Sequence, residues 1–260
     1  MLGDASASGS VVTVGDGTST SFSGVISGAG SLTKTGSGTL SLNGANTFAG
    51  TLLVNGGTLG GVGSFSGPVE IANDGLLAPG NGIGTVTINN TLTMDAGSTT
   101  VMEVNKSAST HDLVQGVTTL TYGGTLVINN VAGSFVSGDS IHLFSAASYA
   151  GAFTSISPAT PGPGLTWDTS ALATIGDIKV AGGGAPQITG TTVIGTNFIF
   201  SGSGGTAGAG FSVLSQTNLA IPLTNWPVIS TGTFDGSGNF RVTNAIVPGT
   251  PKRFYDVRVP

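Results

Sequence analysis

Hydrophobic and polar residues alternate with a period of two along most of this chain, in runs of four to six residues. The runs are bounded by Gly, Asn or Asp, the residues that form tight turns. No window carries the i, i+3, i+4, i+7 pattern of an amphipathic helix, and glycine interrupts nearly every stretch of ten residues. The pattern therefore predicts an all-β fold. Clear examples are SLTKTG at 31, TLSLNG at 39, TLLVNG at 51, TVTINN at 85 and TLVINN at 125.

One short unit, aliphatic–any–aliphatic followed by Asn, recurs through the first part of the chain. A meander or a sandwich there would need many tight turns and protected edge strands. A right-handed parallel β-solenoid over residues 24–180 needs only short strands, stacked so that inward residues form aliphatic ladders. Charged side chains stacked in this way repel, whereas Asn, Ser and Thr hydrogen-bond along the stack. We therefore expect structural turn or ladder roles for Asn43, Asn55, Asn73, Asn89 and Asn129.

Two further segments differ in composition from the repeat. The polar, strand-prone residues 1–23 are predicted to cap the first coil or to lie against a neighbouring subunit. Residues 181–187, AGGGAPQ, read as a linker, and residues 188–260 contain about six alternating runs and are rich in aromatics. They predict a small C-terminal β-sandwich, in which TFDGSGNFRV is expected to form a hairpin.

Charged residues make up only 7% of the chain, against about 25% in an average soluble domain. The net charge of −5 is spread along the sequence, which gives no indication of a nucleic-acid partner. There is no cysteine, so disulfides and thiolate metal sites are impossible. No apolar run is long enough for a transmembrane helix, and the first residues lack an apolar signal segment. If the protein is exported, we expect its signal peptide to lie outside this sequence.

The first part of the chain resembles the passenger region of bacterial autotransporters, specifically the autotransporter-associated β-strand repeat. The similarity lies in GSGTLSLNGANTFAGTLLVNGGTL (36–59), GLLAPGNGIGTVTINNTLTMDAGSTTVMEVN (75–105), HDLVQG (111–116) and GLTWDTS (164–170). This resemblance implies an extracellular or cell-surface solenoid that serves as a stalk or an adhesive surface. It also implies structural roles for Asp112 and Trp167. The C-terminal segment is similar to that of large secreted bacterial β-repeat proteins.

Candidate catalytic chemistry is sparse. The two histidines, His111 and His142, have no evident third metal ligand, and Lys106 is the sole basic residue between residues 35 and 178. The Asp, Arg and Lys cluster of solenoid lyases is therefore not expected, and no Gly-x-Ser-x-Gly motif marks a hydrolase. We expect no enzyme activity, no cofactor and no metal. DGSGN at 235 lacks the glutamate that a calcium loop needs at position twelve, which is Ile246.

These observations predict a non-catalytic extracellular structural protein of bacteria, either a surface stalk or adhesin or a fibre-forming subunit. Its expected partners are copies of itself, assembled head to tail, or components of the cell surface. The alternative is a carbohydrate-binding module, with Trp226, Phe254 and Tyr255 as an aromatic platform for a glycan. Those aromatics equally suit the core of the sandwich.

Overall fold

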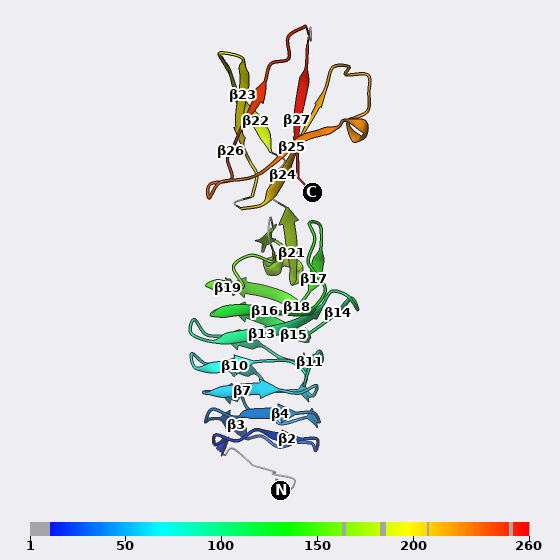
Figure 1. Ribbon diagram of the computed structural model, residues 1–260. Helices are drawn as coiled ribbons and strands as arrows, with labels where there is room; N and C mark the ends of the chain where they lie inside the picture. The colour runs from blue at the N-terminus through cyan, green and yellow to red at the C-terminus, as the bar shows by residue number, and fades with distance from the viewer. Residues whose placement is uncertain (1–10, 163–164, 183–185, 207, 250–251, 260) are drawn as a thin grey trace. The chain divides into compact units, whose positions relative to one another are not determined.

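The computed structural model describes residues 11–162, 165–182, 186–206, 208–249 and 252–259. Its internal contacts divide the chain into two compact units, residues 1–160 with 167–180 and residues 161–166 with 181–260. Figure 1 shows the strands of both units. Residues 1–10 of the predicted N-terminal segment and 183–185 of the predicted linker lie outside the described residues.

The first unit is a stack of parallel coils with three faces, which confirms the predicted β-solenoid (Figure 1). The first face contains β1 (Val11–Val14), β3 (Ser31–Lys34), β6 (Leu52–Val54), β9 (Val69–Ile71), β12 (Leu92–Met94), β15 (Leu113–Tyr122) and β18 (Phe144–Gly151). The second contains β2 (Thr20–Phe22), β4 (Thr39–Leu42), β7 (Gly57–Gly60), β10 (Gly75–Leu77), β13 (Thr99–Asn105), β16 (Thr125–Ala132) and β19 (Ser155–Ser157). The third contains β5 (Ala45–Asn46), β8 (Ser64–Phe65) and β11 (Thr85–Ile88), and it joins β15.

The stack begins before residue 24. β1 pairs in parallel with β3, and β2 pairs in parallel with β4, so residues 11–22 form the first described coil. This part of the predicted N-terminal segment thus continues the solenoid.

The length of the coils varies along the stack. Leu32 pairs with Leu52, Leu52 with Val69, Val69 with Leu92 and Leu92 with Leu120, which gives coils of 20, 17, 23 and 28 residues. The Asn-ending phrase of the sequence does not mark one turn per coil, because it occurs on β4, β6, β9, β11 and β16, on all three faces. Extra residues are accommodated at the turns and, in the 28-residue coil, also in the longer strands β13 and β15.

The inward residues form continuous apolar rows, because alternate side chains of a strand point to opposite faces. On the first face, Leu32, Leu52, Val69, Leu92 and Leu120 lie one above another and are at most 4% exposed. Each fully buried aliphatic side chain contributes roughly 1.5–3 kcal/mol relative to an exposed one. Stacking therefore buries apolar surface that a single coil leaves open.

The first unit also has a short helix and short strands that do not belong to the three faces. β14 (Thr110–His111) pairs with β13, while β17 (Ser140–His142), β21 (Asp177–Gly182) and β20 (Leu165–Asp168) form a three-stranded sheet. The helix α1 (Leu172–Ile175) ends at Gly176, whose φ of 76° lies in the left-handed region. A side chain at Gly176 would also collide with the carbonyl oxygen of Phe144. Glycine is therefore required where the chain turns from α1 into β21.

The second unit consists of two antiparallel sheets, β22–β23–β26 and β25–β24–β27. The strands are β22 (Gln187–Ile194), β23 (Asn197–Ser203), β24 (Gly210–Gln216), β25 (Val228–Thr233), β26 (Phe240–Ala245) and β27 (Phe254–Arg258), with a 3-10 turn at Leu223–Asn225. Both sheets contribute to one core, composed of Phe200, Phe211, Val213, Phe234, Phe240, Val242 and Val257. The sheets thus pack face to face, as in a small sandwich.

The prediction of a hairpin at TFDGSGNFRV is wrong. β25 pairs with β24, whereas β26 pairs with β23, so the loop between them connects the two sheets. Asp235 stabilises this loop by accepting hydrogen bonds from the backbone N–H groups of Ser237 and Asn239, both at 2.9 Å. The turn residues are those of a hairpin, but packing in the shared aromatic core determines which strands pair.

The apolar rows predict that alanine substitution destabilises the protein much more at one leucine of β6 than at the next. Leu52→Ala removes a fully buried side chain from the row and should lower the free energy of unfolding by about 2–5 kcal/mol. Leu53→Ala, on the outward face of the same strand, should cost about 1 kcal/mol or less. Urea unfolding followed by circular dichroism measures both variants. Equal losses would contradict the stacked core.

Candidate functional site

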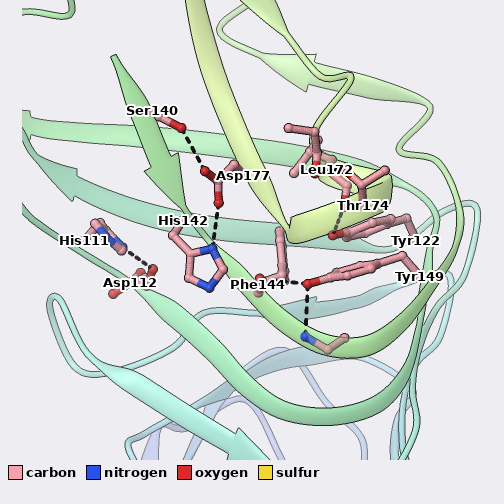
Figure 2. A network of polar contacts seen from close by, with 12 residues as sticks. His111, Asp112, Tyr122, Ser140, His142, Phe144, Tyr149, Leu172, Thr174 and Asp177 are labelled. Carbon is pink, nitrogen blue, oxygen red and sulfur yellow. Dashed lines mark hydrogen bonds and ion pairs between the residues drawn. The ribbon is translucent and has the colours of Figure 1, made fainter. Parts of the chain in front are cut away.

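A cluster of polar side chains lies near the end of the solenoid and is shown in Figure 2. Asp177, the first residue of β21, accepts hydrogen bonds from Ser140 Oγ at 2.9 Å and contacts His142 Nδ1 at 2.6 Å. β17 carries both partners and pairs antiparallel with β21, with His142 opposite Asp177. Burial raises the pKa of Asp177, but the hydrogen bonds from His142 and Ser140 leave it below its ordinary value. The cluster thus binds β17 to β21.

This cluster contains serine, histidine and aspartate but not the geometry of a hydrolase. In a catalytic triad the histidine lies between the serine and the aspartate, so that it can take the serine proton. Here Asp177 lies between Ser140 and His142, as Figure 2 shows. His111 is engaged elsewhere, with its Nδ1 at 2.9 Å from the backbone oxygen of Asp112. In the part of the chain that the structure describes, no three His, Asp or Glu side chains are grouped to hold a metal ion.

Asp112 connects successive coils from a buried position. Its Oδ1 accepts the backbone N–H of Gly84 and its Oδ2 that of Glu103, both at 2.7 Å. The side chain is 1% exposed, and burial raises its pKa to about 6, although the two N–H groups act in the opposite direction. Asp112 therefore links the long turn after β10 to strand β13 through these two hydrogen bonds.

Trp167, on β20, packs within the first unit. Its ring meets Phe135 edge to face at 5.2 Å between centroids, and its Nε1 donates to the backbone oxygen of Pro158 at 2.9 Å. Both the apolar ring and the polar indole nitrogen thus have partners in the same unit.

The turn asparagines make several kinds of bond between coils. Asn43 donates to Ser21 Oγ and accepts from the N–H of Val62, so it bridges the coils on both sides. The side chain of Asn73 accepts from the N–H of Gly97, and that of Asn129 donates to Glu103. Asn55 and Asn89 bond the adjacent coil through their backbone N–H groups. The five lie on different faces and do not stack into one row.

Lys34 and Asn46 are among the buried polar residues that the sequence pattern did not single out. Lys34 occupies an inward position, in register with Val14 and Val54, and is 1% exposed. Its Nζ donates to the carbonyl oxygens of Thr35, Gly36 and Gly56 at 2.6–3.2 Å, while burial lowers its pKa. The alternation in SLTK carries the signal, because Leu32 and Lys34 fall on the same side of the strand.

Asn46 is the second of these residues. It accepts from the N–H of Ile26 and donates to the carbonyl oxygens of Gly44 and Ser64, so it connects three successive coils. Nothing in its sequence neighbourhood distinguishes it from the exposed turn asparagines.

The predicted aromatic platform is not assembled. Trp226 is buried, and its Nε1 donates to the backbone oxygen of Ile221 at 2.9 Å. Phe254 and Tyr255 are consecutive residues of β27 and therefore face opposite sides of the sheet. Tyr255 packs against Phe198 and Phe200, with centroids 5.2 Å apart in each case.

Comparison with known proteins supports the resemblance drawn from the sequence. Residues 32–60, from β3 to β7, match the family model of the Passenger-associated-transport-repeat. An extracellular serine protease of Serratia marcescens is 41% identical over 102 residues, 32% of this chain and 10% of that protein. The adhesin BmaC autotransporter of Brucella suis biovar 1 (strain 1330) is 46% identical over 72 residues, 28% of this chain and 2% of that protein. The resemblance is thereby confirmed, and the chain spans a tenth or less of either relative.

The described residues contain no helix long and apolar enough to cross a membrane.

The raised pKa of Asp112 predicts a specific pH dependence of stability. The folded protein binds a proton at Asp112 near pH 6, whereas the unfolded chain binds it only near 3.8. This group therefore favours the folded state fully below pH 3.8, and its contribution is lost as the pH rises through 6. The change amounts to about 3 kcal/mol at most. We expect the stability of the native protein, measured relative to Asp112→Asn, to fall between pH 4 and about 7.

Thermal unfolding of both proteins across this pH range measures the difference in stability between them. Carboxylates with lowered pKa values are present in both proteins, so their contributions cancel. A constant difference between the two proteins would contradict the assignment of the pKa of Asp112.

Proposed function

We propose that this chain is part of a non-catalytic extracellular protein of bacteria, in which the solenoid is a surface stalk or adhesive element. The observation that carries the proposal is the passenger repeat itself, which coincides with strands in the stacked coils. Of the two similar proteins, one is named as extracellular and the other as an adhesin and autotransporter. The chain spans only a small part of each relative, so the role of the whole protein is itself part of what we propose.

The physical construction of the solenoid suits a stalk. Neighbouring parallel strands lie about 4.8 Å apart, so each coil lengthens the stack by that amount. Every coil is hydrogen-bonded to the next on more than one face, and apolar rows run through the interior. Extension of the stack therefore needs no change in its cross-section, and adhesive groups can be carried on turns or on an added domain.

The absence of catalytic geometry among the described residues supports a non-catalytic role. Ser140 and His142 both bond Asp177, and Asp112 is occupied by two backbone N–H groups. The Serratia relative is named as a protease, but only a tenth of that protein is covered by this chain.

The first test asks whether the chain is exposed on the cell surface or released from the cell. Antibodies raised against the purified chain should label intact cells of the bacterium that produces it, or detect it in the culture medium. An antibody against a cytoplasmic protein serves as the control for cell integrity. Labelling that appears only after the cells are permeabilised, with none in the medium, would refute the extracellular role.

The charge distribution favours self-association as the route to a fibre. Residues 181–260 contain four basic residues and two acidic ones. The whole chain has seven basic and twelve acidic residues, so residues 1–180 contain three basic and ten acidic ones. A basic sandwich of one copy and an acidic solenoid of the next attract each other, and a contact of this head-to-tail kind leads to open filaments.

We therefore expect the apparent mass of the purified chain to rise with concentration at low salt. Light scattering at about 20 mM salt should show this growth, and about 500 mM salt should reverse it because the charges are screened. Monomers at both salt concentrations would rule out the fibre and leave the stalk or adhesin role.

A further inference from the structure

The sandwich contains a pocket of about 170 Å³ at one end of its two sheets. It lies where β23 begins, β26 ends and β27 begins. Among the described residues, its lining consists of Phe198, Ala245, Ile246, Val247, Arg253 and Tyr255. The pocket therefore belongs wholly to the second unit, and it differs from the aromatic platform that the sequence suggested.

Arg253 directly precedes β27, and its side chain lines this pocket together with that of Tyr255. Tyr255 and Val257 share one side of the strand, and Val257 belongs to the sandwich core. Asp256 and Arg258 share the opposite side. Within the described residues Arg253 takes part in no ion pair, because the two ion pairs present are Lys106–Asp139 and His142–Asp177. The pocket thus presents a guanidinium group with no carboxylate of its own.

Tyr255 supplies both a flat wall and a hydrogen-bond donor. Its ring stacks on Phe198 with an interplanar angle of 26°, which fixes its orientation. Its hydroxyl oxygen accepts from Asn244 Nδ2 at 2.7 Å, so the hydroxyl hydrogen remains for another acceptor. At the rim, Ile246 and Val247 are 44% and 51% exposed, an apolar surface open to solvent.

We propose that this pocket binds one uronic acid residue of an acidic polysaccharide. The carboxylate pairs with the guanidinium of Arg253, which matches it with two parallel hydrogen bonds. The C–H face of the sugar ring lies against Tyr255 and Val247, and a ring hydroxyl accepts from the hydroxyl of Tyr255. The excess of basic residues in residues 181–260 favours an anionic polymer.

Two other ligands fit the pocket less well. A neutral sugar leaves the guanidinium of Arg253 without a partner. A peptide carboxylate with an aliphatic side chain uses Arg253 and the apolar rim but has no sugar-like C–H face to lie against Tyr255. The uronate proposal rests on the extracellular location proposed above, where such polymers occur, but its test is independent of cell labelling.

Isothermal titration calorimetry of the full chain with a galacturonic acid trimer tests the proposal. The methyl-esterified trimer is the ligand control, since it keeps the rings and loses the charge. Arg253→Met should weaken binding of the trimer about tenfold or more. Arg258→Met removes the same charge from the other side of β27 and should change the affinity by about twofold or less.

Several results would overturn the proposal. These are equal affinity for the acid and its ester, equal losses for the two arginine variants, or binding of a free-carboxyl peptide and not of the trimer. Val247→Asp gives a second check, because it places a carboxylate at the exposed rim and should abolish binding without disturbing the core. Retained binding in Val247→Asp would equally refute the site. A failure of every binding test leaves the extracellular stalk untouched, because antibody labelling of intact cells decides that role separately.

Discussion

Parallel pairing of each coil with the next is the constraint on which this structure depends. A strand of three or four residues is too short to be stable alone, but its backbone groups and its inward side chains find partners on the adjacent coil. Because pairing is in register, an inward residue is covered by inward residues of the coils on either side, as Leu52 is by Leu32 and Val69. The coils differ in length, and this difference is absorbed at the turns and in the longer strands β13 and β15.

The same constraint determines how polar groups are used inside the stack. A buried donor or acceptor without a partner costs about 1–3 kcal/mol, more when it is charged. Lys34 meets three carbonyl oxygens, Asn46 bonds three coils, and Asp112 accepts two N–H groups. Each of these side chains hydrogen-bonds backbone groups that have no partner within an irregular turn. The few charged residues of the first unit thus include two that hold the backbone together from inside.

The two units differ in how they use their side chains. Many side chains of the solenoid make contacts between successive coils. The sandwich is basic, has an aromatic core, and leaves Arg253 beside an open pocket. The passenger repeat found in residues 32–60 lies within the solenoid.

Local signals in the sequence were sufficient for the fold class, for the existence of the coils and for the number of sandwich strands. They rest on alternation and on turn residues, which act over a few positions, and the run SLTK at β3 shows both inward places of its strand. Which strands pair is a different matter, since it depends on surfaces far apart in the chain. The loop at Asp235 looks like a hairpin locally but joins two sheets, because Phe211 and Phe240 meet in one core. Similarly, the pocket beside Arg253 exists only where three strands end together, a place that no single stretch of the sequence describes.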